Sequence, residues 1–236
     1  MTNSRRSCAA SRSGEKPNAT RRRRYTIDLG LALVRSGAAT RPLLLILADD
    51  CFPGGCVATG SGAQEEALFR RTNLCRALSM AHYPIRDGEA VYAPDVAVFK
   101  NGERHATDPF GKLVAQPAPL LDFVACPGIR HPMLSSEGRL YEADEARLEV
   151  KVRTVLQVAA RHGNDAVVFG AIGCGAWKCP PTHVAEVLAR ELASAAESGA
   201  FRRIDLAVLR GTAPGYITVD HAAVDNFSVF SRVFPS

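Results

Sequence analysis

A buried strand that leads directly into a glycine-rich turn and a helix constrains this chain most. Residues 43–48, Leu-Leu-Leu-Ile-Leu-Ala, are continuously apolar and predict a fully buried strand. Residues 53–66 follow as Pro-Gly-Gly-Cys-Val-Ala-Thr-Gly-Ser-Gly-Ala-Gln-Glu-Glu, and the lack of Gly and Pro in residues 67–80 predicts one helix over about 64–80. Glycines let a backbone approach a ligand closely, and a helix N-terminus offers unpaired N–H groups to an anion. The turn is therefore a candidate site with carboxylates beside an anion.

Further apolar runs alternate with helical patterns. Strands are predicted over residues 121–126, 166–172 and 204–209, an edge strand near 92–102, and helices over 141–162 and 182–198 with Thr182 as N-cap. This alternation predicts an α/β fold with a parallel-rich sheet, whose ligands bind beyond the carboxyl ends of the strands. A second glycine turn, Gly173-Cys174-Gly175-Ala176-Trp177, follows the strand at 166–172. Two such turns at one sheet edge could hold a diphosphate between their N–H groups.

Length and composition favour a single domain without a membrane span. The chain has 236 residues, of which 47% are hydrophobic, enough for one sizeable core. No run approaches about 18 consecutive apolar residues, and the polar N-terminus lacks the apolar region of a secretory signal. The seven cysteines show no disulfide framework, which favours a reducing compartment. We therefore expect no membrane contact and an intracellular location, cytoplasmic or nuclear.

The charge is concentrated at the N-terminus. The chain carries a net charge of +5, but residues 1–41 alone hold ten Lys and Arg against two acidic residues, so the remainder is net negative. Residues 1–24 are predicted to be a basic disordered tail, and residues 25–236 the folded domain. The tail could contact nucleic acid or another polyanion, or it could be a solvated arm. The four arginines of residues 21–24 could also form a nuclear address.

Other nucleotide and metal motifs find little support. A P-loop sequence is missing, and residues 60–65 lack the third glycine of a dinucleotide fingerprint. Cys51 and Cys56, and likewise Cys174 and Cys179, form two Cys-x4-Cys pairs on loops that should converge. A four-thiolate zinc site is conceivable, but structural zinc sites prefer tighter spacing, and small buried thiols explain the pairs as well. We expect neither a metal nor a cofactor.

The two turns together resemble a known family. The pattern Gly-Gly-x8-Gln-Glu-Glu after a buried strand, the segment at 92–99, the glycine turn ending at Gly175 and the Asn-Phe-x-x-Phe ending are similar to the microbial-type poly(ADP-ribose) glycohydrolases of the macrodomain superfamily. The resemblance covers about residues 43–234. It implies a macrodomain-like three-layer α/β/α sandwich with a mixed, largely parallel sheet. It also implies metal-independent cleavage of ribose–ribose bonds to release ADP-ribose.

The resemblance also implies roles for individual residues. Because Glu65 and Glu66 are adjacent, their side chains diverge by about 100° on a helix, so only one can face the ligand. The family pattern makes Glu66 the general acid/base and Glu65 its support, which orients the substrate through a ribose hydroxyl. The expected substrate-binding residues are Asp49, Gly54, Gly55, Cys56, Gln64, Gly173, Cys174, Gly175, Ala176, Trp177 and Phe227. Core packing is the alternative role for Trp177 and Phe227, and simple helix stabilisation that for the glutamates.

Two positions depart from the family pattern. Cys56 replaces the third glycine, and Asp49 stands where the family has an asparagine that contacts a ribose. Both changes bear on turnover more than on binding. Three functions therefore stay open at the level of sequence: a poly(ADP-ribose) glycohydrolase, a mono(ADP-ribosyl) hydrolase, and a reader module that binds ADP-ribose without hydrolysing it.

Overall fold

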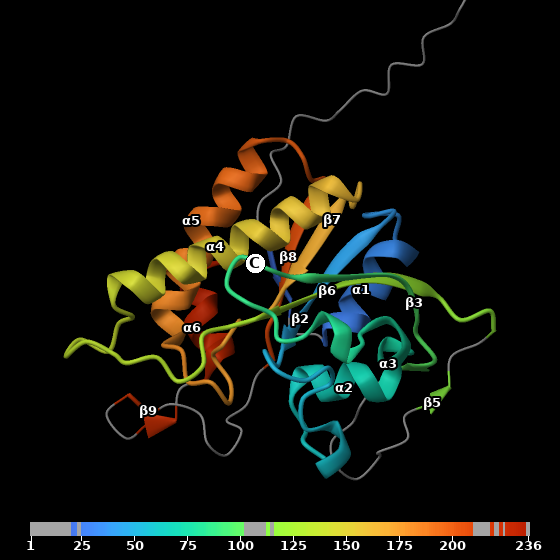
Figure 1. Ribbon diagram of the computed structural model, residues 1–236. Coiled ribbons are helices and arrows are strands. Elements are labelled where there is room, and N and C mark those ends of the chain that lie inside the picture. Colours follow the sequence, from blue (N-terminus) through green and yellow to red (C-terminus); the bar gives the residue numbers. More distant parts are fainter. Residues whose placement is uncertain are drawn as a thin grey trace, which may run out of the picture.

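A computed structural model shows a six-stranded sheet between two layers of helices (Figure 1). It describes residues 20–22, 25–101, 112–113, 116–209, 218–219, 222–223 and 225–234. The sheet has the order β1-β8-β7-β2-β6-β3. Its strands are β1 (Thr20–Arg22), β2 (Pro42–Ala48), β3 (Val91–Ala97), β6 (Leu120–Pro127), β7 (Ala166–Phe169) and β8 (Arg203–Ala207). All neighbouring strands are parallel except β3, which runs antiparallel to β6 at one edge.

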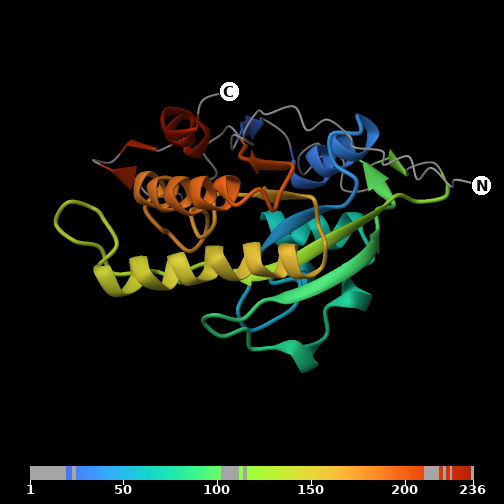
Figure 2. The ribbon, with the colours of Figure 1, turned by 90° about the horizontal axis from the view of Figure 1, so that it is seen from above.

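Helices cover both faces of this sheet (Figures 1 and 2). One layer contains α1 (Thr26–Arg35), α2 (Gln64–Arg71) and α3 (Leu74–Ala77); the other contains α4 (Glu142–Arg161), α5 (Pro181–Glu197) and α6 (Asn226–Val233). Short elements complete the described chain: η1 (Val57–Thr59), η2 (Met80–His82), and the strand pairs β4 (Lys100–Asn101) with β5 (Lys112–Leu113) and β9 (Thr218–Val219) with β10 (Ala222–Ala223). The expected three-layer α/β sandwich is confirmed.

The continuous apolar run of β2 is explained by burial on both faces. Leu43 and Leu45 pack into the core beneath α4, α5 and α6, whereas Leu44 and Ile46 pack into the core beneath α1, α2 and α3. Side chains alternate between the faces of a strand, so only a strand that is covered on both sides needs apolar residues at every position. None of the helices among the described residues is long and apolar enough to cross a membrane.

The expected single helix over residues 64–80 is wrong. Helix α2 ends at Arg71, and Thr72 instead forms an isolated bridge with Val98. The Asn73 side chain accepts a hydrogen bond from the Ala97 N–H at 2.8 Å, while its own N–H donates to the Ala97 carbonyl. Tertiary contacts with the end of β3 thus replace helical hydrogen bonds that the local sequence permits.

The structure also differs from the sequence-based expectation at the start of α5 and in the N-terminal segment. Pro180, not Thr182, is the N-cap residue of α5, and Pro181 occupies its first turn, where a missing N–H costs nothing. Residues Thr20–Arg22, inside the segment expected to be a disordered tail, pair with β8 as an edge strand. The rest of that segment, residues 1–19 and 23–24, lies outside the described residues.

The predicted edge strand forms as β3, with a register shift between Ala93 and Val96. Pro94 and Asp95 occupy this irregularity, and Asp95 has a positive φ of 52°. Proline cannot donate to a sheet ladder and is therefore confined to edges and bulges. The Asp95 N–H donates to buried Asp122 at 3.0 Å, which stabilises the bulge.

Candidate active site

Three loops meet at the carboxyl edge of the parallel strands. They follow β2, β6 and β7, which are neighbours in the sheet. The loop after β6 and the second glycine turn are in close backbone contact, because a Cβ at Gly128 would lie 2.8 Å from the Gly173 Cα. Side chains at this position would force the two loops apart. The topology therefore places both predicted glycine turns at one edge, where ligands bind in open α/β sheets.

Glu65 stabilises the first loop, residues 49–63 between β2 and α2, from inside. Its side chain is buried, and its two carboxylate oxygens accept the N–H of Asp49 at 2.7 Å and of Gly54 at 2.9 Å. Burial raises the pKa of Glu65 to about 7, despite these two hydrogen bonds, and the neighbouring charges of Glu66 and Asp49 add to the increase. Both acceptor oxygens of Glu65 are thus used by the protein itself.

Glu66 is held on one side only. Its Oε1 accepts the Cys56 N–H at 3.1 Å. Its Oε2 is buried and has no hydrogen-bond partner among the described residues. A buried carboxylate oxygen without a partner is costly, so its presence in a fold points to a role with a bound molecule. Of the two adjacent glutamates, Glu66 is therefore the one with a free oxygen.

The glycines of the first loop are required by its shape. Gly54 has a φ of 82°, and a Cβ there would lie 2.7 Å from the Phe69 ring. Gly55 has a φ of 51°, and its Cβ would lie 2.9 Å from Glu66 Oε1. Cys56 differs, because its φ of −97° is ordinary for an L-residue and its side chain is exposed. A cysteine at the third glycine position therefore leaves the loop unstrained.

Gln64 holds the first turn of α2 against the sheet. Its Oε1 accepts the Leu47 N–H at 2.9 Å, and its Nε2 donates to the Leu45 carbonyl at 2.8 Å and to Thr26 Oγ1 at 3.1 Å. The amide is thus occupied by β2 and α1. We assign Gln64 a structural part in the site, in place of the direct ligand contact expected from the sequence.

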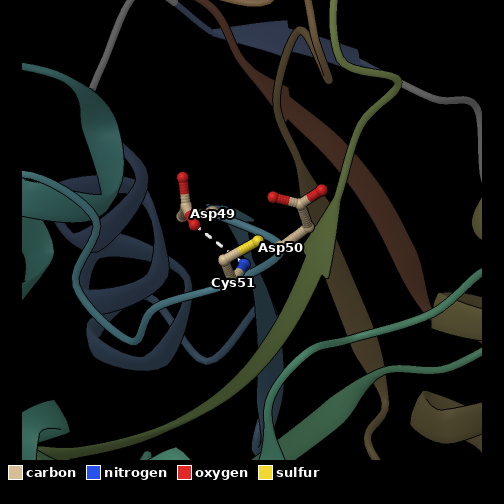
Figure 3. Close-up of side chains that lie close together, drawn as sticks. All are labelled: Asp49, Asp50 and Cys51. Atoms are coloured by element: carbon tan, nitrogen blue, oxygen red, sulfur yellow. Dashed lines mark hydrogen bonds between the residues drawn. The ribbon is translucent and has the colours of Figure 1, made fainter.

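Asp49 and Asp50 lie at the end of β2 and share one cation. Asp49 Oδ1 accepts the N–H of Cys51 at 2.8 Å (Figure 3). It also accepts the N–H of Phe52 at 3.0 Å. Its Oδ2 accepts from Arg130 Nη2 at 2.9 Å, and the same nitrogen contacts Asp50 Oδ1. Partial burial would raise the pKa of Asp50, but hydrogen bonds from Arg130 and Cys51 and the charge of Arg130 lower it below its ordinary value.

Arg130 and Tyr83 are site residues that the sequence alone did not indicate. The Arg130 guanidinium lies 4.5 Å from the centroid of the Trp177 ring, so it connects the two predicted loops. The Tyr83 hydroxyl is buried without a partner among the described residues, and burial, followed by the charges of Glu65 and Asp49, raises its pKa. Neither residue belongs to a recognisable spacing, and only the fold brings them to the loops.

The second loop, the glycine turn at residues 173–177 after β7, has a different hydrogen-bond pattern from the first loop. Gly173 has a φ of 73°, and a Cβ there would lie 2.5 Å from Cys179 Sγ. The N–H of Cys174 donates to the Ala171 carbonyl, but within the described part of the chain the N–H groups of Gly175, Ala176 and Trp177 have no acceptor. Three consecutive free N–H groups are what an anion site offers.

Two further predicted site residues, Cys174 and Phe227, are buried. Cys174 is buried, and its carbonyl accepts from Asn226 Nδ2 at 3.2 Å, which connects the second loop to α6. Phe227 is only 8% exposed and belongs to the core beneath α4, α5 and α6. This position favours the core-packing role of Phe227 over direct stacking on an adenine.

The cysteines do not come together as a four-thiolate set. Cys51 and Cys56 are exposed, whereas Cys174 and Cys179 are buried, with the Cys179 thiol donating to the Ile129 carbonyl at 3.2 Å. The one group of three potential metal ligands found among the described residues is Asp49, Asp50 and Cys51 (Figure 3). Arg130 bonds to both carboxylates of that group, so a cationic side chain already offsets part of their charge.

Comparison with known proteins agrees with this geometry. Residues 6–101 match the family described as microbial-type PARG, catalytic domain. A poly(ADP-ribose) glycohydrolase from Thermomonospora curvata is 28% identical, with a TM-score of 0.74 over 96% of this chain and 80% of the other. The chain is similar to the microbial-type poly(ADP-ribose) glycohydrolases. The resemblance expected from the sequence is therefore confirmed.

Other solved structures extend the similarity to ligand complexes. The T. curvata enzyme bound to the inhibitor ADP-HPD is 26% identical, with a TM-score of 0.74 over 92% of this chain and 79% of the other. The Deinococcus radiodurans enzyme in complex with ADP-ribose shares the fold at 24% identity, with a TM-score of 0.73 over 94% of this chain and 85% of the other. Among curated proteins none matches.

The family match corrects the expected extent of the resemblance. It begins at residue 6, whereas the sequence motifs placed the start near residue 43. Most of the basic N-terminal segment thus lies inside the matched region. The domain boundary between residues 24 and 25 stays a prediction.

Proposed function

We propose that this chain hydrolyses poly(ADP-ribose), cleaving ribose–ribose glycosidic bonds to release ADP-ribose. Glu66 acts as general acid/base, and the chemistry needs no metal. The observation that carries this proposal is the buried Oε2 of Glu66, which has no partner among the described residues while Oε1 is held by the Cys56 N–H. A general acid must be oriented and must also keep an oxygen that is not bonded within the protein.

In this proposal a single carboxyl group, that of Glu66, serves first as the acid and then as the base. Protonated Glu66 donates its proton to the glycosidic oxygen as the bond to the anomeric carbon breaks, leaving an oxocarbenium-like sugar. The resulting carboxylate then takes a proton from the water that attacks that carbon. Glu65 is not a second catalytic carboxylate, since both of its oxygens accept backbone N–H groups. It holds the first loop in the shape that orients Glu66.

The second loop would bind the diphosphate. The three N–H groups at Gly175, Ala176 and Trp177, which have no acceptor in the described structure, support this assignment, together with the similarity to PARG structures that contain ADP-ribose. The face of Trp177 would contact the ribose. The basic N-terminal segment would add a contact to the polymer's phosphates, and an intracellular location stays a prediction.

A reader module is the second candidate, and one observation favours it. The Asp49 carboxylate accepts from Cys51, Phe52 and Arg130, so the position that contacts a ribose in the family is occupied by contacts within the protein. Such a site could bind ADP-ribose without orienting the sugar for cleavage. The ordinary backbone at Cys56, in contrast, no longer argues against turnover.

Incubation with automodified poly(ADP-ribose), followed by chromatography of the products, tests the proposal. Release of ADP-ribose by the wild type, and its loss in Glu66→Gln, is the expected result. Release from mono-modified protein alone would establish a mono(ADP-ribosyl) hydrolase. Binding of ADP-ribose without release from either substrate would establish the reader module.

A further inference from the structure

We propose that Arg130 is a positioning residue that offsets the negative charge of Asp49 and Asp50 at the end of β2 and holds Trp177 in place. The contacts of Arg130 with Asp49, Asp50 and Trp177 are called the Arg130 bridge here. The proposal rests on the proposed function, because it assigns Arg130 a part in binding an anionic ligand.

The first element of the bridge is electrostatic. Arg130 Nη2 contacts Asp49 Oδ2 at 2.9 Å and Asp50 Oδ1, and among the described residues it is the only cation that contacts either carboxylate. The segment from residue 49 to 66 also carries Glu65 and Glu66, so four acidic side chains lie on the loop and the first turn of α2. A diphosphate bound at the second loop would bring further negative charge close to Asp49 and Asp50, because Arg130 contacts both of them and Trp177. Arg130 offsets that repulsion at the residues nearest the end of β2.

The second element is the stacking on Trp177. The Arg130 guanidinium lies 4.5 Å from the ring centroid, and the N–H of the next residue, His131, donates to the Trp177 carbonyl at 2.9 Å. Arginine suits this position because its planar cation can stack on an aromatic face while its N–H groups donate to carboxylates. The loop after β6 thus connects the carboxylates of the first loop to the aromatic ring of the second.

The bridge is accessible enough to respond to a ligand. The Arg130 side chain is 44% exposed, and those of Asp49 and Asp50 are 20% and 34% exposed. Ion pairs at this exposure add little to folding stability, because solvent screens them. Loss of the bridge should therefore change ligand binding and the local environment of Trp177 more than it changes global unfolding.

Trp177 is the only tryptophan in the chain, so its fluorescence reports on the bridge alone. Acrylamide quenching without ligand and calorimetry with ADP-ribose are measured on the wild type, Arg130→Ala and Arg130→Lys. Arg153→Ala is the matched control, because Arg153 forms ion pairs with Glu149 and Glu191 on the outer helices. Arg130→Ala should increase the quenching constant about twofold and weaken ADP-ribose binding at least about tenfold, while Arg130→Lys retains part of the affinity.

A rescue variant separates charge neutralisation from general damage. A triple variant that adds both Asp49→Asn and Asp50→Asn to Arg130→Ala removes the two unpaired carboxylates. Its ADP-ribose affinity should return to within about threefold of wild type, while Trp177 stays as open to acrylamide quenching as in Arg130→Ala. If the triple variant binds ADP-ribose as weakly as Arg130→Ala does, the electrostatic role is overturned. If acrylamide quenches Arg130→Ala no more than the wild type, the stacking role is overturned. If the wild type fails to bind ADP-ribose, the proposed function fails, whereas the quenching result still decides whether the bridge exists.

Discussion

The two glycine loops use their backbones in opposite ways. In residues 51–57 of the first loop, every N–H has an acceptor within the protein. Cys51 and Phe52 donate to Asp49, Gly54 to Glu65, Gly55 to the Phe52 carbonyl, Cys56 to Glu66, and Val57 to the Gly54 carbonyl. In the second loop, three consecutive N–H groups at residues 175–177 have no acceptor within the described structure. The first loop is thus closed by its own carboxylates, and the second is open to a ligand.

Because their N–H groups differ in this way, we expect the two loops to have different roles in the site. A loop whose N–H groups are already bonded cannot offer them to a phosphate, but it can hold carboxylates rigidly. A loop with free N–H groups can bind an anion but has no acid or base of its own. From the sequence alone, both loops are expected to bind the diphosphate in the same way. Under the proposed function, the first loop therefore holds the acid/base and the second binds the anion.

The largest expected effect is on chemistry at the first loop. Glu66→Gln keeps an Oε1 that can accept the Cys56 N–H but removes the proton donor and base. Product release should fall at least about 10²-fold, while ADP-ribose affinity changes little. Single-turnover release from poly(ADP-ribose) and calorimetry measure the two quantities. A Glu66→Gln variant with wild-type release would contradict the assignment of the acid/base.

The buried carboxylate of Glu65 should make the stability of the first loop depend on pH. Its pKa in the folded protein, about 7, is above that of an exposed glutamate, so the folded state binds the proton more tightly than the unfolded chain does. The stabilisation is complete below about pH 4.5 and is lost as the pH rises through 7, by up to about 3 kcal/mol. Urea unfolding from pH 4.5 to 7.5 measures it.

Glu65→Gln is the control for that pH dependence, because Gln does not titrate. The stability of the wild type relative to Glu65→Gln should fall by up to about 3 kcal/mol as the pH rises from 4.5 through 7. Parallel stability curves for the two proteins would show that Glu65 does not titrate in this range.

Adding one methyl group to either loop should separate their roles. Gly173→Ala introduces a Cβ 2.5 Å from Cys179 Sγ at a φ of 73°, and should weaken ADP-ribose binding at least about tenfold. Gly55→Ala introduces a Cβ 2.9 Å from Glu66 Oε1 at a φ of 51°, and should lower turnover more than affinity.

Gly199→Ala controls for backbone strain alone. Its φ is 69°, and an added Cβ would meet nothing within 4 Å. Calorimetry and turnover are measured on all three variants, with thermal unfolding as the measure of folding. Equal losses of binding in the Gly55 and Gly173 variants would remove the proposed division between the loops.

The smallest expected effect concerns Tyr83, whose hydroxyl is buried without a partner in the described structure. If this group donates to a ligand, Tyr83→Phe should weaken ADP-ribose binding about two- to tenfold, the value of one hydrogen bond. The free protein should be as stable as the wild type or slightly more stable, since an unsatisfied buried group is removed. An unchanged affinity would show that Tyr83 contacts no ligand. Thermal unfolding and calorimetry give both values.

Much of this protein follows from its sequence alone. The apolar run of β2 and the alternation of strands and helices determined an α/β sheet covered on both faces, because only full burial requires apolar residues at every strand position. The glycine turns were visible because positive φ angles and close approaches leave few alternatives to glycine. The adjacency of Glu65 and Glu66 was enough to predict different roles for them, and Glu65 supports the first loop by accepting the N–H groups of Asp49 and Gly54.

Only the tertiary structure decided the remainder. Helix α2 ends at Arg71 because Thr72 and Asn73 bond to the end of β3, a partner that lies about 25 residues away in the chain. Arg130 joins the site only because β6 lies beside β2, so that the loop following it reaches Asp49 and Asp50. Local patterns record which conformations a segment can adopt, but hydrogen bonds and ion pairs between distant segments depend on how the sheet brings those segments together.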